Sequence, residues 1–336
     1  MIAYLEDLER RIIPEVEERL LADWRTFLRG EWPEPIFAPK RERVLPSAVA
    51  WPDIPINDAL EDLDLMVLSQ LRIVSDLLAG GSPLNVRCNY GTGIVPTMFG
   101  AELFVMPREL NTLPTTRPIG PEGVREALER PLPELNAGLM ERVWRCRERF
   151  ERVLEPYPKL KQYVHVYHPD WQGPMDICEL LWGSGLFYAL LDEPETVHGL
   201  LARITELYRR LMDAWGPSKE EAFHWGFMHR GGIVLRDDSA MNLSPAMFGE
   251  FIAPYDGELL ARYGGVVHFC GRGDHFIERL AELPGLTGVN MSQPEYNDME
   301  RIYAQTVDRN IPLLGFPAGA AMAAGRPLRG RVHALT

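Results

Sequence analysis

The sequence contains few cysteines and no long hydrophobic run. Its four cysteines, Cys88, Cys146, Cys178 and Cys270, are far apart, form no Cys-x-x-Cys pair and are expected to be reduced. The longest nearly apolar stretch, at 180–191, is too short to span a bilayer, and the acidic N-terminus is unlike a secretory signal. We therefore expect a cytoplasmic protein that is not inserted in a membrane.

Positive charge is also scarce. The chain has 35 Lys and Arg against 48 Asp and Glu, a formal net charge of -13. Because an acidic surface repels phosphate backbones and anionic lipid, nucleic acid is not an expected partner. The remaining composition, with 46% hydrophobic and 25% charged residues, is that of a soluble globular protein. A chain of 336 residues suffices for one large α/β domain or two ordinary ones.

Two helical stretches and a proline-rich segment are expected before residue 80. Apolar residues recur every three or four positions over 1–29 and again over 57–79, which predicts amphipathic helices. The prolines between residues 32 and 46 exclude regular helix there and indicate an ordered arm or an active-site loop.

Short apolar runs that end in glycine or polar residues alternate with helical segments through the rest of the chain. The runs lie at 84–93, 227–238, 264–271, 286–294, 311–319 and 330–336, and helical spacing covers 121–154, 174–190, 194–215, 244–263, 274–283 and 297–309. This alternation predicts a parallel sheet. The number of units favours an α/β fold of the (β/α)8 TIM-like barrel type, with residues 57–336 as the barrel and residues 1–56 as an N-terminal helical extension with a proline-rich arm. No GxGxxG motif follows the first strand, so a dinucleotide-binding fold is disfavoured.

The stretch GGVVHFCGRGD, at 264–274, contains two good metal ligands one residue apart. Side chains alternate along a strand, so His268 and Cys270 are expected to point to the same side, at the carboxyl end where barrel active sites lie. Imidazole nitrogen and thiolate sulfur suit zinc, but a catalytic zinc site needs three protein ligands and an open position. For an isolated pair the alternative is a buried histidine beside a buried thiol.

Residues 236–271 resemble the uroporphyrinogen decarboxylase superfamily, and residues 173–201 resemble the segment that precedes that motif in the family. The matching positions are Asp237, Ala240, Leu243, Ser244, Phe248, Phe251, Pro254 and Tyr255. The resemblance extends from about residue 57 and implies a barrel, and family members often form dimers, so a homodimer is one expectation. The two-arginine loop of the tetrapyrrole decarboxylases is absent, because Arg41 and Arg43 do not match its pattern. The chain is therefore more similar to the corrinoid-dependent methyltransferase branch.

In that branch a His-x-Cys strand and a later cysteine bind zinc, and His268 and Cys270 match the first part. No cysteine follows Cys270, and His333, in the last expected strand, falls near the third position. The alternatives for the third ligand are a pocket carboxylate or none, and the alternative for His333 is an exposed histidine near the C-terminus. The resemblance implies a zinc-bound thiolate as the nucleophile and a methylcorrinoid, presented by a partner protein, as the donor.

Further site residues are expected at other strand ends. Asp237 and Asp238 follow a strand and are candidate catalytic carboxylates that adjust each other's pKa or orient a substrate; the alternative is a helix start. His229, Arg230 and Arg236 are candidates for binding an anionic substrate group, against the alternative of a solvated loop.

Tyr90 precedes a glycine-rich turn and is a candidate hydrogen-bond donor to a substrate, with simple packing as the alternative. His165 and His168 lie on an expected strand and are excluded as metal ligands, because they would face opposite sides.

Three functional hypotheses follow. The first is an enzyme that transfers a methyl group from a corrinoid or a methylated small molecule to a thiol, with zinc at His268, Cys270 and His333. The second is a metal-free, decarboxylase-like enzyme that acts on a small carboxylate through Arg230, Arg236 and the aspartates. The third is a non-catalytic protein that binds a corrinoid or tetrapyrrole.

Overall fold

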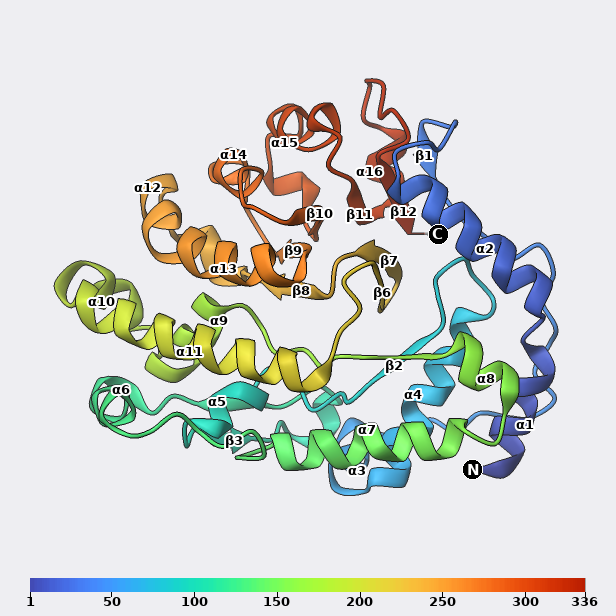
Figure 1. Cartoon of the computed structure of the whole chain (residues 1–336), viewed down its shortest axis with the longest axis horizontal. Coiled ribbons are helices and arrows are strands. Elements are labelled where there is room, and N and C mark those ends of the chain that lie inside the picture. The colour runs from blue at the N-terminus through green and yellow to red at the C-terminus, as the bar shows by residue number, and fades with distance from the viewer. Residues whose placement is uncertain (336) are drawn as a thin grey trace.

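Parallel strands form the centre of the computed structural model, which describes residues 1–335 (Figure 1). A six-stranded sheet has the order β1-β12-β11-β10-β9-β8, and a separate two-stranded sheet pairs β2 with β5; every pairing in both is parallel. The bounds are β1 Ile36–Phe37, β2 Asn85–Arg87, β5 His165–Tyr167, β8 Ile233–Arg236, β9 Gly265–Phe269, β10 Leu286–Met291, β11 Leu313–Pro317 and β12 Val332–Leu335. The predicted α/β class with a parallel sheet is therefore confirmed.

The parallel strands follow one another in chain order, and β1 returns to lie beside β12. This is the order of strands in a (β/α)8 barrel. Within residues 1–335, however, no strand ladder joins β1 to β2 or β5 to β8, so the hydrogen-bonded sheet is not closed. We call the junction between β5 and β8 the seam.

A β-hairpin lies between the two parallel sheets (Figure 1). It consists of β6 (Glu221–His224) and β7 (Phe227–Arg230), with Phe223 opposite Met228, and β7 contacts β9 and β10. The single strand expected over 227–238 is wrong, because the chain reverses between β7 and β8. Gly231 makes this possible: its φ is 81°, and a Cβ there would lie 2.2 Å from the carbonyl carbon of Gly264.

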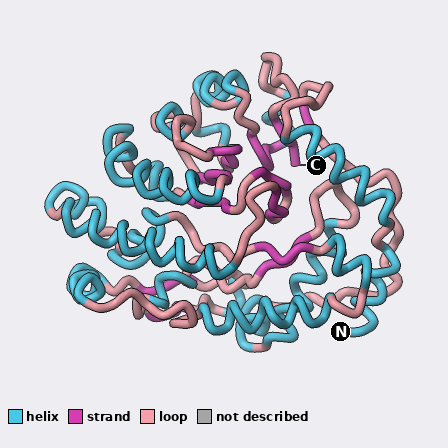
Figure 2. The backbone as a smooth tube through the Cα atoms, viewed as in Figure 1, coloured by secondary structure: helices cyan, strands magenta, loops and turns pink. Residues whose placement is uncertain are grey.

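Helices surround the strands (Figure 2). They are α1 Ile2–Arg11, α2 Pro14–Leu28, α3 Ile56–Glu61, α4 Leu63–Leu77, α5 Ile94–Met98, α6 Gly120–Glu129, α7 Met140–Leu154, α8 Pro158–Tyr163, α9 Pro174–Trp182, α10 Leu186–Asp192, α11 Pro194–Trp215, α12 Pro245–Met247, α13 Ala253–Tyr263, α14 Ile277–Leu280, α15 Met299–Gln305 and α16 Ala318–Met322. A second antiparallel hairpin, β3 (Glu102–Phe104) with β4 (Thr115–Arg117), lies between α5 and α6 in the chain.

Several expected helices are interrupted at identifiable residues. The helix expected over 1–29 is α1 and α2, because Pro14 starts a new helix. The helix expected over 57–79 divides at Asp62, whose side chain caps α4. The helix expected over 121–154 is α6 and α7, separated by a segment that contains Pro131 and Pro133.

The N-terminal segment belongs to the same hydrophobic core as the rest of the chain. Trp24 and Phe27 of α2 pack with Phe37 of β1 and with His333 of β12. The ring centroids of Trp24 and His333 are 4.4 Å apart. The expected arm thus contributes a strand to the main sheet. Its residues are tied to the last strand by aromatic packing as well as by backbone pairing.

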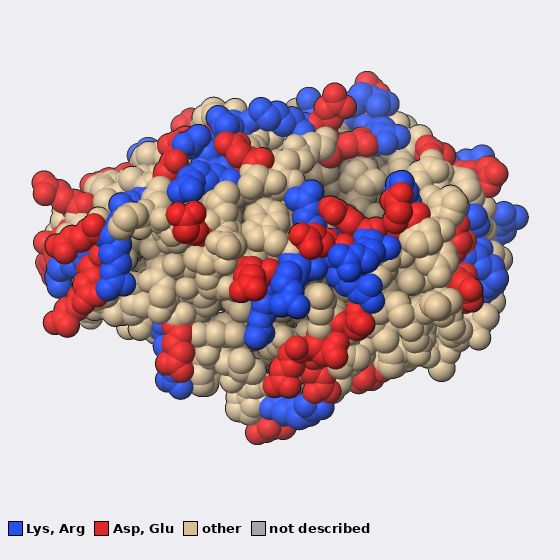
Figure 3. Space-filling model, turned by 60° about the horizontal axis from the view of Figure 1, so that its bottom comes forward, with Lys and Arg blue, Asp and Glu red and all other residues tan. Residues whose placement is uncertain are grey.

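No helix within residues 1–335 combines the length and the apolar character that crossing a bilayer requires. On the face drawn in Figure 3, basic side chains lie scattered among acidic ones and form no continuous patch.

Candidate metal centre and adjoining pocket

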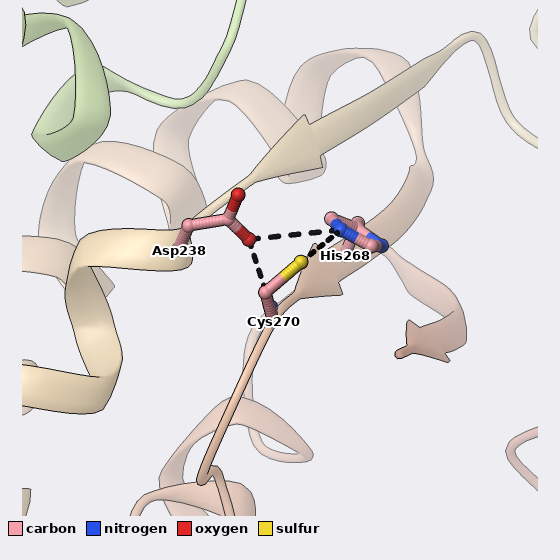
Figure 4. Close-up of side chains that lie close together, drawn as sticks. All are labelled: Asp238, His268 and Cys270. Carbon is pink, nitrogen blue, oxygen red and sulfur yellow. Dashed lines mark hydrogen bonds and ion pairs between the residues drawn. The ribbon is translucent and has the colours of Figure 1, made fainter. Parts of the chain in front are cut away.

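Three potential metal ligands meet at the carboxyl ends of β8 and β9 (Figure 4). Asp238, His268 and Cys270 each offer one ligand atom, and these atoms all lie within 4.8 Å of one another. The His268 Nε2 is 3.3 Å from the Cys270 Sγ and 3.6 Å from the Asp238 Oδ1. The arrangement joins a nitrogen, a sulfur and an oxygen donor at one point.

Strand register brings these residues together. Arg236, at the end of β8, is paired with His268 of β9. Two residues further along, Asp238 and Cys270 therefore lie at the same level. The Cys270 N–H donates to the Asp238 Oδ1 at 2.8 Å, which fixes the carboxylate beside the thiol. His268 and Cys270 lie on the same side, as the alternation of strand side chains requires.

Asn290 determines which nitrogen of His268 faces the group. The Asn290 side-chain N–H2 donates to the Leu314 carbonyl at 2.6 Å, which leaves its Oδ1 to accept from the His268 Nδ1–H at 2.6 Å. The Nε2 therefore carries the lone pair that points toward Cys270 and Asp238. Burial, together with the positive charge of Arg236, lowers the pKa of His268 and favours the neutral, ligating form.

The Cys270 thiol is half-buried and borders solvent. Burial raises its pKa above the ordinary value, and its Sγ lies 3.4 Å from the Ser292 Oγ. A coordinated cation opposes this effect, because a coordinating thiol loses its proton. The donor set of one imidazole, one thiol and one carboxylate fits zinc, and three protein ligands are what a catalytic zinc site has.

His333 is not among these ligands. Its Nδ1 accepts a hydrogen bond from the Gly315 N–H at 2.9 Å, and its ring packs against Trp24. Burial lowers its pKa to about 3. The expectation that His333 completes the metal shell is corrected by this geometry: the third donor in the group is the carboxylate of Asp238.

Asp237 and Asp238 face different surroundings, because adjacent residues at a strand end point to opposite sides. Asp237 is fully buried, and none of the four carboxyl oxygens of Asp237 and Asp256 has a hydrogen-bond donor among the described residues. Burial and the nearby Asp256 carboxylate raise the pKa of Asp237 well above its usual range. Burial likewise raises the pKa of Asp256 to about 7. Asp237 lies beneath the site, beside Asp256 of α13, and only Asp238 belongs to the group. The catalytic role expected for Asp237 stays a prediction.

A pocket of about 490 Å³ adjoins Asp238, within the usual range for small-molecule sites. It lies beyond the carboxyl ends of β2, β5 and β8 and so spans the seam. We call it the rim pocket. Its lining residues are Thr92, Thr116, Pro118, Gln172, Asp176, Glu179, Leu180, Gly183, Ser184, Asp238, Ser239 and Asn242.

Asp176 and Ser239 join the rim pocket to the end of β8. The Asp176 carboxyl accepts from the backbone N–H groups of Asp238 at 2.9 Å and Ser239 at 2.8 Å. Burial and the charge of Asp237 raise the pKa of Asp176 well above its usual range. Asp176 therefore positions the segment that carries Asp238.

The other expected substrate-binding residues lie outside the rim pocket. Arg236 pairs with Asp170 at 2.6 Å, and Arg87 lies 4.0 Å from the same carboxylate. His229, on β7, is fully buried; its Nε2 is 2.9 Å from the Tyr167 hydroxyl, and burial lowers its pKa to about 4. Arg230 is the last residue of β7 and comes shortly before the start of β8, whereas Asp238 follows the end of β8.

Tyr90 is buried and lines a different pocket, together with Arg142, Arg145, Leu60, Glu61 and Leu63. Burial and the neighbouring Cys146 raise the pKa of its hydroxyl. The structure does not bring Tyr90 to the group at Asp238.

Three residues of the site and its pocket were not expected from the sequence: Asn290, Asp176 and Glu179. Asn290 had a detectable signal, since it is a polar residue near the carboxyl end of the mostly apolar strand β10. Asp176 and Glu179 had no such signal, because acidic residues on an amphipathic helix are normally expected to face solvent.

The fold and the site together define a parallel α/β chain with a three-donor group and an acidic pocket at the carboxyl rim. The chain is similar in structure to a methyltransferase from Methanosarcina mazei, with a TM-score of 0.55 and 16% sequence identity over 77% of this chain and 71% of that one. At this identity the likeness shows a shared fold. Neither a protein-family model nor a curated protein sequence matches the chain.

Proposed function

We propose that the protein is a zinc-dependent methyltransferase, related to the uroporphyrinogen decarboxylase superfamily, in which Asp238, His268 and Cys270 hold the metal. The observation that carries the proposal is the convergence of these three donors within 4.8 Å at the carboxyl rim. The likeness in fold to a methyltransferase supports the reaction class. The proposed donor is a methylcorrinoid presented by a partner protein, and the proposed acceptor is a thiol.

The chain's own residues have defined tasks in this proposal. Asn290 holds the His268 ring with Nε2 toward the group, and the Cys270 N–H keeps the Asp238 carboxylate in place. Bound zinc supplies a positive charge that keeps an acceptor thiol deprotonated near neutral pH. The rim pocket, which shares Asp238 with the group, holds the remainder of the acceptor.

We also infer that the parallel strands are an opened (β/α)8 barrel, with the hairpin β6–β7 inside it. The chain order of the strands supports this reading. So does a backbone bond across the seam, from the Gly173 N–H to the Arg236 carbonyl at 2.7 Å.

The test measures zinc content and methyl transfer in the same samples. We expect about one zinc per chain in the wild type, and loss of zinc in Cys270→Ser and His268→Ala, since each removes one donor. Cys146→Ala, which changes a buried cysteine of α7, is the control that should retain zinc. Methylcobalamin and 2-mercaptoethanol serve as donor and acceptor, and formation of the methyl thioether is the readout.

Absence of zinc from the wild type, even after incubation with the metal, would overturn the proposal. If cobalamin nevertheless bound and no thioether formed, a corrinoid-binding protein without catalysis would be favoured. Decarboxylation of a small carboxylate by metal-free protein would instead favour the second hypothesis.

A further inference from the structure

Two arginines at strand ends share one carboxylate in the interior of the fold. Arg87 is the last residue of β2, Arg236 is the last residue of β8, and both line a small cavity with Asp170, which we call the arginine cavity. The Asp170 Oδ1 lies 2.6 Å from the Arg236 Nε, whereas the Asp170 Oδ2 is 4.0 Å from the Arg87 Nη1. Because a guanidinium keeps its proton in proteins, two positive charges stand here against one negative charge.

The other ionisable groups around the arginine cavity supply no second anion. They are Tyr167, His168 and His224. Burial lowers the pKa of His168 to about 3 and lowers that of His224 well below its ordinary value, so both imidazoles are neutral near neutral pH. Burial also raises the pKa of the Tyr167 hydroxyl, which keeps its proton. The lining of the cavity therefore has an excess of one positive charge.

Arg87 provides an independent sign of a ligand. The residue is only 7% exposed, its closest carboxylate oxygen is the one 4.0 Å away, and its guanidinium N–H groups have no hydrogen-bond acceptor among residues 1–335. The Trp225 ring covers one face of the guanidinium, with the Arg87 Cζ 4.3 Å from the ring centroid, and leaves the N–H edge toward the arginine cavity. A buried cation without an acceptor is costly, and the oxygens of an anion satisfy it.

The size of the arginine cavity restricts what enters it. Its volume is about 10 Å³, roughly the room that one water molecule needs. Only the end of a ligand fits, and the planar carboxylate matches the fork of a guanidinium with two oxygens. The tetrahedral head of a sulfonate or phosphate carries more oxygens and needs more room.

We propose that Arg87 and Arg236 bind the carboxylate of the substrate, so that the acceptor is a short mercaptocarboxylate rather than a thiol with a sulfonate or no charge. The thiol end rests on the proposed function, because it would lie at His268 and Cys270. Arg236 is paired with His268, and Cys270 is two residues further along, about 7 Å at the rise of a strand. A short carbon chain covers this separation, and any further part of the acceptor remains in the rim pocket.

The test uses acetate, which has the carboxylate without the thiol, on zinc-free protein. Sodium acetate, sodium methanesulfonate and sodium chloride are compared at equal ionic strength by thermal unfolding, because a ligand of the folded state raises the Tm. We expect acetate to bind the wild type at least about tenfold more tightly than the other two anions, and Arg87→Met to lose at least this factor. Arg147→Met is the control: Arg147 also lies over a tryptophan, Trp215, but pairs with Glu151 and should leave acetate binding unchanged.

The stability of Arg87→Met distinguishes a binding role from a structural one. In buffer without acetate, the variant should unfold at a urea concentration no lower than the wild type, because it removes a buried cation that lacks an acceptor. A clear loss of stability would show that Arg87 serves the fold and would overturn the inference. So would equal binding of acetate and chloride, which marks a site for free anions, equal binding of methanesulfonate, or no anion binding at all.

A comparison on zinc-loaded protein separates this inference from the proposed function. There, 3-mercaptopropionate should bind at least about tenfold more tightly than 2-mercaptoethanol in the wild type, and the two should bind alike in Arg87→Met. If acetate binding depends on Arg87 but the protein holds no zinc, the carboxylate site stands and the proposed function fails. If zinc is bound and the two thiols bind the wild type equally, the mercaptocarboxylate is overturned and the metal site stands.

Discussion

Asn290 decides which nitrogen of His268 can bind a metal. Its amide is held by the Leu314 carbonyl, so only its oxygen faces the imidazole. Without that acceptor the ring is free to rotate or to change tautomer. In the proposed metal site, Asn290 would therefore act indirectly, through the orientation of His268, and its effect is separable from that of the ligands themselves.

We predict that Asn290→Ala weakens zinc binding about 10- to 100-fold, the usual cost of removing a group that orients a metal-bound histidine. Competition with a chromophoric chelator measures the affinity, and circular dichroism checks that the variant is folded. Asn57→Ala removes another side-chain amide that donates to a carbonyl, that of Met106, and should leave the affinity unchanged. Equal affinities in the two variants would contradict the role of Asn290.

The placement of His268 and Cys270 side by side was predictable at this scale, and the third donor beside them was not. Alternation along β9 suffices to place His268 and Cys270 on one side. The choice of Asp238 over Asp237 depends on the register between β8 and β9, which no local pattern encodes. His333 was misplaced because its position depends on packing against Trp24, a contact between distant parts of the chain.

At the scale of elements, the seam depends on a close backbone approach at Gly173. A Cβ there would lie 2.4 Å from the Asp237 Oδ1 and 2.5 Å from the Arg236 carbonyl oxygen. The second of these contacts is backbone, which cannot move aside as a flexible side chain can. Only glycine allows the segment that precedes α9 to lie this close to the end of β8.

Gly173→Ala should lower the free energy of unfolding by about 1–3 kcal/mol, the typical cost of forcing extra atoms into a packed site. Urea denaturation measures the change. Gly319→Ala is the matched control: it lies in α16 with nothing within 4 Å of the added Cβ. There we expect no loss, or a gain of up to about 1 kcal/mol from helix propensity. Equal stability of the two variants would show that the seam tolerates a side chain.

Element types were easier to predict than their ends. The alternation of strands and helices was correct, because apolar periodicity is encoded locally. The hairpin β6–β7 was missed because residues 227–238 read as one apolar run, and its reversal depends on Gly231 packing against Gly264. The prolines at 131 and 133 were sufficient to divide the helix expected over 121–154.

For the whole molecule, the aromatic packing of Trp24 and Phe37 against His333 links the N-terminal segment to the last strand. Burial lowers the folded-state pKa of His333 to about 3, from an ordinary value of 6.5. As the pH falls below about 6.5, the unfolded chain takes up a proton that the folded chain does not. His333 therefore stabilises the fold at neutral pH, and this contribution is lost as the pH falls toward 3.

His333→Gln should be less stable than the wild type at pH 7.5, and this deficit should shrink at pH 5 by up to about 1.4 kcal/mol per pH unit below 6.5. Urea unfolding at several pH values measures both proteins. Phe37→Leu changes a non-titrating neighbour in the same cluster, so its deficit should not vary with pH. A constant deficit in His333→Gln would show that the pKa of His333 is the same in the folded and the unfolded chain.

The position of the rim pocket across the seam has a mechanical consequence. One wall comes from the segments that follow β2 and β5, and the facing wall comes from the segment that follows β8. No strand ladder ties these walls together within the described chain. The two walls are joined instead by the bond from the Gly173 N–H to the Arg236 carbonyl and by the Asp176 carboxyl, which accepts from the Asp238 and Ser239 N–H groups. The width of the pocket therefore depends on these few bonds, and loosening any one of them changes the distance between its walls.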